Sequence, residues 1–260
     1  ESLVRDAVKR VFGESTHLEL IFRQATQLTL PENAQVVVPP TLVPEAVLKP
    51  EDPHAEFTFD NFVVGGSNRL AHAFAMEVAE GKWRKPVLFV AQTGSGKTHL
   101  LRATLRAFLQ RGDVTARYTT AEAFCNDFGD ALRVEKDVEM PRFRKKYREP
   151  DLLAIDGAHF FSKKDGFSRQ LLLTMEERED RGLPLLLSST KNPPGMKISP
   201  ELMRRLEAAS CAIDPPDEEV RVGIVLQFAG RLGLKLGTEW AKLIADRTTS
   251  FGEIQSGLNR

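Results

Sequence analysis

The chain has 260 residues, and its 36 basic and 36 acidic side chains give a formal net charge of zero at pH 7. This balance provides no global attraction to nucleic acid or to a membrane surface, so any anion-binding surface must be local. The two cysteines have no CxxC spacing, and no apolar run approaches about 20 residues. These features argue against a disulfide framework, a zinc site and a membrane span, and they favour a cytoplasmic protein.

The first part of the chain predicts a short α-β piece over residues 1–38. Apolar residues from Leu3 to Phe12 recur at helical spacing, and those from Leu18 to Phe22 alternate as in a strand. Five prolines between positions 39 and 53 disfavour regular structure and predict a linker over residues 39–56.

From residue 57 onward, helical segments alternate with buried apolar runs, which predicts an α/β fold with a parallel sheet covered by helices on both faces. The expected strands are residues 87–91, 116–120, 152–156, 185–190 and 211–214. This α/β subdomain is predicted to span residues 57–214. After two prolines the pattern becomes helical only, with Asp217 as a plausible N-cap, so residues 215–260 predict a small helical lid that is cut short by the chain end.

A glycine loop follows the first expected strand and has the pattern of a nucleotide phosphate cradle. Gly94, Ser95 and Gly96 can bring backbone N–H groups to a polyphosphate, Lys97 can reach the β and γ phosphates, and Thr98 can hold Mg²⁺. The helix expected over residues 99–110 directs its positive N-terminus at the phosphates. The loop departs from the strict pattern at one position, because Ala91 stands where that pattern has its first glycine. The sequence therefore predicts that ATP and Mg²⁺ bind here.

Asp156 ends an apolar strand, as expected for the carboxylate that orients Mg²⁺ opposite a phosphate loop. Gly157 occupies the next position, where many nucleotide motors have a second carboxylate that polarises the attacking water, so hydrolysis is expected to be slow. The hydroxyls of Ser188, Ser189 and Thr190 end another strand. They either sense the γ-phosphate or simply lead into the following turn.

Two clusters of basic residues allow two interpretations each. Arg204 and Arg205 either complete a neighbouring subunit's nucleotide site as an arginine finger or lie on a solvated helix face. The basic segment 142–148 contains Phe143 and Tyr147 on one helix face. These rings either stack on bases or, as we prefer, pack inward beneath solvated charges.

Together these segments resemble the DnaA family of bacterial replication initiators, which are AAA+ proteins. The most specific match is Phe57-Thr-Phe-Asp-Asn-Phe-Val-Val-Gly65, continued by residues 67–72. Further matches are residues 93–101, 143–147, 152–156, 188–189, 215–216 and 257–260.

The resemblance implies an AAA+ P-loop sheet domain with a lid, and it implies roles for several residues. It assigns nucleotide contacts to Phe62, Val63, His99 and Ser189, with the adenine enclosed by the segment before the phosphate loop. It also assigns the interprotomer finger to Arg205, with Arg204 as a rival because the spacing is about one residue short, and the second sensor arginine to Arg260. Residues 1–38 are similar to the end of the family's N-terminal domain, which engages the replicative helicase.

The sequence also departs from the family pattern. The family has a second acid at position 157, an aspartate and an arginine around positions 190–192, and a phenylalanine where this chain has Leu206. ATP binding is expected to survive these changes better than turnover or filament assembly. The chain also stops before the family's helix-turn-helix DNA-binding domain, which indicates a divergent member or a fragment.

The sequence thus leads to the hypothesis of an ATP-gated switch with at most slow ATPase activity. By the resemblance, it self-associates on origin DNA to promote duplex melting and helicase loading. The basic residues Lys136, Arg144 and Lys164 are candidates for contact with a single strand. The alternative hypothesis is a regulatory or helicase-loader partner that binds ATP and protein without melting DNA. A kinase or continuous motor is disfavoured because Gly157 removes the obvious catalytic carboxylate.

Overall fold

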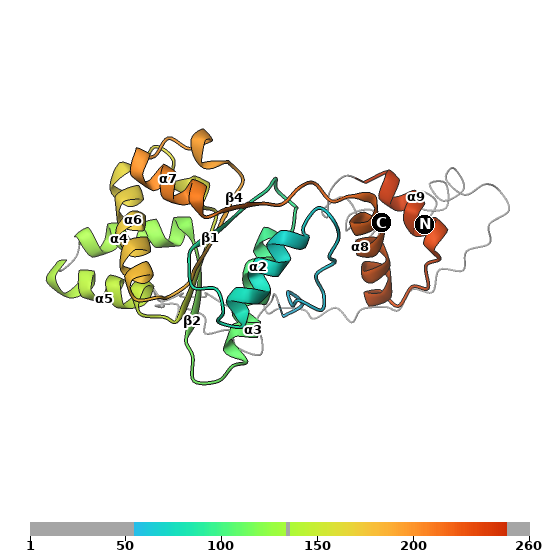
Figure 1. Cartoon of the computed structure of the whole chain (residues 1–260), viewed down its shortest axis with the longest axis horizontal. Helices are drawn as coiled ribbons and strands as arrows, with labels where there is room; N and C mark the ends of the chain where they lie inside the picture. Colours follow the sequence, from blue (N-terminus) through green and yellow to red (C-terminus); the bar gives the residue numbers. More distant parts are fainter. Residues whose placement is uncertain (1–54, 134–135, 249–260) are drawn as a thin grey trace, which may run out of the picture. The chain divides into compact units, whose positions relative to one another are not determined.

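The computed structural model describes residues 55–133 and 136–248. The predicted N-terminal helix and strand, nearly all of the linker, and Arg260 lie outside the described residues. Within the described ranges, Figure 1 shows the following elements in chain order: α2 (Arg69–Ala79), β1 (Val87–Val90), α3 (Lys97–Leu109), β2 (Ala116–Thr120), α4 (Ala121–Arg133), α5 (Lys136–Arg148), β3 (Leu152–Asp156), η1 (Ala158–Phe161), α6 (Asp165–Asp180), β4 (Leu185–Ser189), η2 (Pro193–Gly195), α7 (Pro200–Ala208), β5 (Ser210–Ala212), α8 (Glu218–Arg231) and α9 (Thr238–Asp246).

The five described strands form one parallel sheet in the order β2-β3-β4-β1-β5. This confirms the predicted α/β fold, and the order is that of an AAA+ P-loop domain. The predicted ends of three strands were wrong by one or two residues, because β1 stops at Val90, β4 stops at Ser189 and β5 covers only Ser210–Ala212. Beyond β5, the Asp214 N–H donates to the Ser67 carbonyl at 3.0 Å and so joins a loop instead of a strand.

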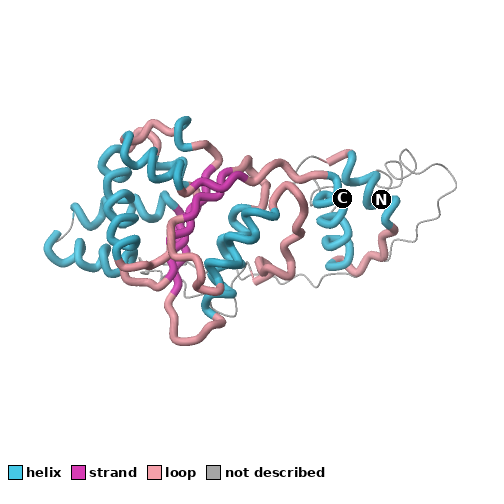
Figure 2. Tube along the Cα trace, viewed as in Figure 1, coloured by secondary structure: helices cyan, strands magenta, loops and turns pink. Residues whose placement is uncertain are grey.

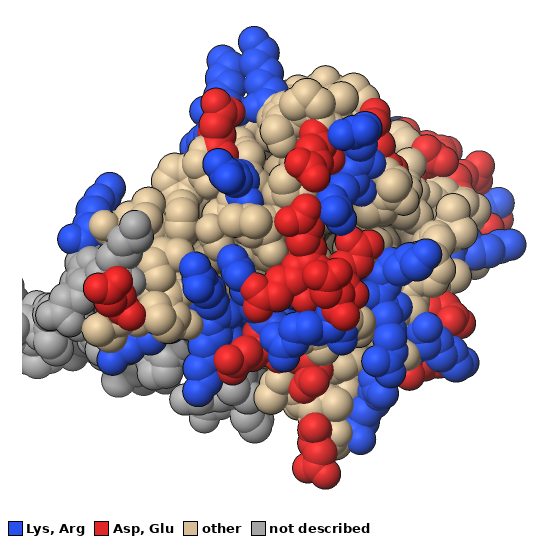
Figure 3. Space-filling view, turned by 60° about the vertical axis from the view of Figure 1, so that its left-hand side comes forward, with Lys and Arg blue, Asp and Glu red and all other residues tan. Residues whose placement is uncertain are grey.

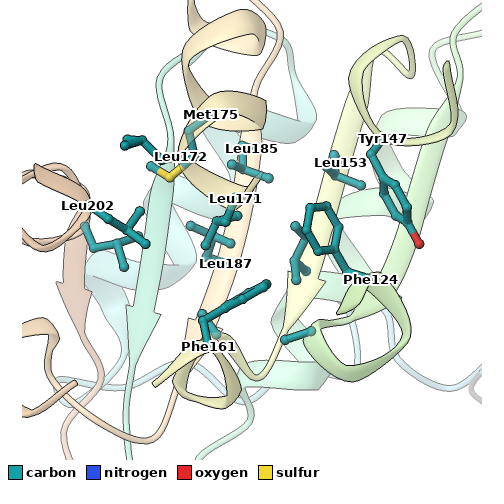
Figure 4. Close-up of a cluster of buried hydrophobic side chains, with 14 of the residues drawn as sticks. Phe124, Tyr147, Leu153, Phe161, Leu171, Leu172, Met175, Leu185, Leu187 and Leu202 are labelled. Carbon is teal, nitrogen blue, oxygen red and sulfur yellow. The ribbon is translucent and has the colours of Figure 1, made fainter. Parts of the chain in front are cut away.

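Helices cover both faces of the sheet, as Figure 2 shows. Successive strand residues point to opposite faces, so Leu88 and Val90 of β1 enter one hydrophobic core while Val87 and Phe89 enter the other. The first core is closed by α4, α5, α6 and α7, and part of it is drawn in Figure 4. The second core is closed by α2 and α3. The sheet is therefore held from both sides, which fixes the strand ends that carry the site.

The aromatic side chains of α5 pack into the first core. Phe143 is 3% exposed and Tyr147 is fully buried, and both rings contact Phe124 of α4. The prediction that these rings pack inward is confirmed, which excludes base stacking on them. By contrast, Arg142 and Arg144 on the same helix are exposed.

Arg178 of α6 is a charged side chain with no exposed surface. Its guanidinium donates to the carbonyls of Pro150 at 2.9 Å and Pro184 at 2.7 Å, and more weakly to those of Tyr147 and Arg148. These carbonyls belong to the end of α5 and to the turns that lead into β3 and β4. Burial lowers the pKa of Arg178 to about 9, so the side chain stays charged at pH 7. It therefore ties α5, α6 and two central strands together.

In the described part of the chain after β5 there are two helices, and Asp217 connects the first of them, α8, to the segment that precedes α2. The Asp217 carboxylate accepts the Val220 N–H at 2.9 Å, which confirms the predicted N-cap of α8. It also accepts the Ser67 N–H at 3.1 Å, from the segment that precedes α2. Behind this cap, α8 and α9 share a small core that contains Val225, Ala241 and Ala245.

We expect Asp217→Ala to lower the free energy of unfolding by about 1 kcal/mol at pH 7, the usual effect of losing an N-cap. The backbone N–H groups of Val220 and then Ser67 hold the Asp217 pKa below its ordinary value. Stability from a depressed carboxyl pKa is fully present above about pH 4 and is lost as the pH falls through the folded value. Urea denaturation at pH 7 and pH 3 should therefore show a difference that shrinks in acid. The exposed Asp246→Ala serves as the control, and an equal loss in both variants would contradict the cap.

Candidate functional site: a nucleotide cradle at the strand ends

The phosphate loop connects β1 to α3 and needs glycine for two physical reasons. Gly94 and Gly96 both have φ of 81°, in the left-handed region that other residues adopt only with strain. A Cβ on Gly96 would also approach Phe62 Cε2 to 3.0 Å. The loop can therefore lie against the Phe62 ring with its backbone N–H groups at the start of α3. This arrangement fits a polyphosphate, which such a helix N-terminus attracts.

Lys97 is the first residue of α3, and its ammonium group points back at the loop. Nζ donates to the carbonyls of Ala91 at 2.8 Å and Gln92 at 2.6 Å. An ammonium has three N–H donors, so these two bonds leave capacity for a phosphate oxygen. Burial lowers the pKa of Lys97, and the nearby Asp156 carboxylate partly opposes this shift.

Asp156 is surrounded by three hydroxyl groups. Oδ2 accepts from Thr98 Oγ1 at 2.6 Å and from the Tyr118 hydroxyl at 2.8 Å, and Oδ1 accepts from Ser188 Oγ. Burial, followed by the Asp156 charge, raises the pKa of Tyr118, so the phenol remains a donor. A hydroxyl beside a carboxylate supplies the oxygen ligands that Mg²⁺ prefers, so Thr98 and Asp156 are the residues that would hold the ion. Bound there, Mg²⁺ would neutralise phosphate charge.

Gly157 follows Asp156 with φ of 84°, and its N–H donates to Ser188 Oγ at 2.9 Å. Two residues later, His159 in η1 accepts the Thr190 N–H on Nδ1 at 3.3 Å. These bonds join the end of β3 to the end of β4. Position 157 is a glycine at this edge of the sheet, and it supplies no second carboxylate beside Asp156.

Aromatic rings close the side of the cradle nearest residues 57–62. His99 stacks on Phe57, with ring centroids 4.8 Å apart, and meets the edge of Phe62 at 5.2 Å. His99 Nε2 lies 2.7 Å from the Thr58 carbonyl and therefore carries a proton. Burial lowers the pKa of His99, which makes the ring neutral at pH 7. A neutral aromatic wall beside a phosphate cradle suits a nucleotide base.

These groups surround one cavity of about 350 Å³, within the usual range for small-molecule sites. It receives residues from the phosphate loop, from the ends of β3 and β4, from the segment before α2, and from α8. The lining comprises Phe57, Asn61, Phe62, Val63, Ser67, Asn68, Thr93, Gly94, Ser95, Gly96, Lys97, Thr98, His99, Asp156, Gly157, His159, Ser188, Thr190, Ile213, Asp214, Pro216, Val220, Ile224 and Gln227.

Most of the predicted nucleotide contacts line this cavity, but Ser189 and the two arginines of α7 do not. The fully buried Ser189 hydroxyl donates to the Lys191 carbonyl at 2.6 Å, and it is Ser188 that reaches Asp156. Arg205 donates to the carboxylates of Glu179 at 2.8 Å and Glu176 at 3.1 Å, both on α6 of the same chain. Arg260 lies outside the described residues.

The sequence alone assigns no role to Tyr118 or to His159. Tyr118 lies within the expected strand 116–120, but the three-hydroxyl arrangement depends on neighbouring strands whose register the sequence does not give. Position alone is a weak signal for His159, which comes three residues after Asp156. Among the described helices, none combines the length and apolar character that crossing a bilayer requires.

The sequence matches the family described as the bacterial DnaA ATPase domain over residues 54–210. The chromosomal replication initiator protein DnaA of Levilactobacillus brevis is 36% identical over 227 residues, which is 85% of this chain and 48% of that protein. The DnaA of Francisella philomiragia is 33% identical over 212 residues, which is 79% of this chain and 42% of that protein. The chain thus spans less than half the length of these relatives.

Solved structures agree with the sequence matches. Domain III of the Thermotoga maritima replication initiation protein DnaA superposes with a TM-score of 0.71 at 30% identity, covering 78% of this chain and 86% of that one. A replication initiator DnaA bound to AMPPCP and single-stranded DNA gives a TM-score of 0.72 at 26% identity, covering 79% and 64%. With more than half of its length matched by the family and the same fold as these solved structures, the chain belongs to the bacterial DnaA ATPase domain family of AAA+ proteins.

Proposed function

We propose that this chain is the ATP-gated assembly module of a replication initiator, which self-associates on origin DNA to promote duplex melting and helicase loading. The observation that carries the proposal is that the phosphate loop, the Asp156 carboxylate and the aromatic rings of residues 57, 62 and 99 line the same cavity. In it, Lys97 binds the phosphates, Thr98 and Asp156 hold Mg²⁺, and Phe62 and Val63 border the base. The replication initiators among its relatives support this assignment.

The proposed module keeps ATP bound much longer than a motor would. Gly157 supports this, since it brings no carboxylate to polarise the attacking water. ATP then acts chiefly as a switch, because a ligand shifts an assembly equilibrium by its differential affinity for the two states. Slow hydrolysis removes the γ-phosphate and releases the assembly.

The residue that reads a neighbouring protomer's nucleotide is proposed to lie on α7. Arg205 is engaged by Glu176 and Glu179 of its own chain, so it must exchange these partners to reach another molecule. Arg204 is exposed, and its Nε donates to the Pro200 carbonyl at 3.4 Å. Both arginines therefore remain candidates for the finger.

Single-stranded DNA is the proposed nucleic-acid partner, through Lys136, Arg144 and Lys164. Arg144 is exposed on α5, and Lys164 Nζ lies over the Phe160 ring just before α6. On the face shown in Figure 3, basic and acidic side chains are intermixed, so binding depends on local groups. A solved DnaA bound to AMPPCP and single-stranded DNA supports the choice of partner.

We expect the chain to assemble on a single-stranded oligonucleotide only when ATP is bound, and sedimentation measures this assembly. The triple variant Lys136→Ala, Arg144→Ala, Lys164→Ala is expected to lose DNA binding. Each lost phosphate contact lowers affinity and reduces the salt dependence of binding. The matched control removes three exposed charges elsewhere, with Lys82→Ala, Lys85→Ala and Lys242→Ala. Equal DNA binding by the two triple variants would contradict the proposed contacts, and equal assembly with ATP and ADP would contradict the switch.

A second candidate function is a regulatory or helicase-loader partner that binds ATP and protein without melting DNA. It is favoured by the two intrachain carboxylates that hold Arg205, because an arginine committed to its own chain is less available to a neighbouring protomer. Nucleotide-dependent capture of a replicative helicase or initiator, with no DNA binding by the unmodified chain, would select this function.

A further inference from the structure

The space beside Gly157 is bordered by the imidazole of His159. A Cβ built on Gly157 would lie 3.7 Å from His159 Cε1. A side chain at position 157 would therefore project toward the same part of the cavity that His159 lines. The ring thus stands next to the place where a second carboxylate would be found.

The hydrogen bond to His159 determines which ring nitrogen carries the proton. The Thr190 backbone N–H donates to Nδ1 at 3.3 Å, so Nδ1 is the acceptor and the neutral ring holds its proton on Nε2. Burial, with further contributions from the Lys191 and Lys97 charges, lowers the pKa of His159. The ring is therefore neutral at pH 7 and presents Nε2–H as a donor.

An N–H donor and a carboxylate have opposite chemical effects at this position. A carboxylate accepts a proton from water and assists hydrolysis, whereas an N–H group cannot accept one and instead pairs with a phosphate oxygen. We propose that His159 is a specificity-determining residue, which recognises the terminal phosphate of ATP through Nε2–H and distinguishes ATP from ADP. This inference rests on the proposed nucleotide site and deepens it.

The bond to Thr190 gives this contact a further effect. It joins η1 to the segment just after β4, and Lys191 follows immediately. A phosphate held by His159 thereby orders the end of β4, which also carries Ser188 and its bond to Asp156. The terminal phosphate, which ADP lacks, then acts on both η1 and the end of β4.

The test compares the dissociation constants of AMPPCP and ADP, both with Mg²⁺, for the unmodified chain, His159→Ala and His159→Gln. A hydrogen bond to a charged group predicts about a tenfold loss of AMPPCP affinity in His159→Ala, with ADP affinity unchanged within about twofold. Glutamine keeps an N–H donor, so His159→Gln is expected to recover most of the AMPPCP affinity. A thermal melt without nucleotide establishes that each variant is folded.

The outcomes separate this inference from the proposed function. Equal losses for AMPPCP and ADP in His159→Ala would show a structural role and overturn the inference, as would unchanged affinity for both. Failure of the unmodified chain to bind either nucleotide would instead reject the proposed nucleotide site. If His159→Ala does not fold, His159→Leu replaces it, because leucine fills part of the ring's volume without a donor. Loss of AMPPCP affinity with ADP affinity kept is expected for this variant, and unchanged affinity for both would overturn the inference.

Discussion

Lys97→Ala is expected to weaken ATP binding by about 100-fold, because it removes the only ammonium group among the residues that line the cavity in the described part of the chain. Charge-assisted hydrogen bonds to phosphate contribute about 1.5 to 3 kcal/mol, and each 1.4 kcal/mol corresponds to a tenfold change. At an ATP concentration of about 100 times the dissociation constant, the unmodified chain should gain about 2.7 kcal/mol of stability, and this gain should largely disappear in the variant. A thermal melt with and without ATP and Mg²⁺ measures both.

Lys85→Ala is the control, since Lys85 is exposed and outside the cavity. It should keep the full ATP-dependent stabilisation. In the absence of nucleotide, Lys97→Ala loses only the bonds to the Ala91 and Gln92 carbonyls, so its melting temperature should stay close to that of the unmodified chain. An ATP-dependent shift of the same size in Lys97→Ala would contradict the phosphate cradle.

Arg178→Met is expected to lower the free energy of unfolding by about 3 to 5 kcal/mol, since each buried carbonyl that loses a donor costs about 1 to 3 kcal/mol. This is the largest stability effect that we predict for a single substitution. The thioether fills part of the volume but donates nothing, so the Pro150 carbonyl loses its guanidinium donor and the Pro184 carbonyl keeps only the Leu153 N–H at 3.3 Å. The midpoint of urea denaturation, at an unchanged slope, measures the loss.

Arg181→Met is the matched control, because Arg181 is an arginine at the C-cap of the same helix, α6. Arg181 is exposed and donates to the Arg148 carbonyl at 3.0 Å, so its loss should change stability by less than about 1 kcal/mol. Similar midpoints for the two variants would contradict the role of Arg178 as the tie between α5, α6 and the central strands.

Much of the fold could be predicted because the sheet and the phosphate loop have strong local signals. A strand buried on both faces is a short continuous apolar run, and each such run was found within one or two residues of its place. The glycine loop was recognisable because two of its positions require positive φ and the following lysine and threonine have defined chemistry. Asp156 could be added because it ends an apolar run downstream of that loop, as expected for the carboxylate that orients Mg²⁺ opposite a phosphate loop.

The remaining features depend on tertiary contacts that no local pattern encodes. Arg178 lies in a highly charged stretch that is typical of a solvated helix face, yet it is fully buried. Ser188, and not Ser189, reaches Asp156, because Ile155 pairs with Leu187 and the next residues of the two strands therefore face each other. Register of this kind is set by packing across the whole sheet.

The most direct test of the central claim is a single-turnover experiment with labelled ATP on the unmodified chain, following bound triphosphate and released ADP together, with Lys97→Ala as the control. An ATP-gated switch predicts tight binding that is lost in the control, with the triphosphate persisting for many minutes because Gly157 provides no catalytic carboxylate. Rapid multiple turnover, or the absence of nucleotide binding, would contradict it.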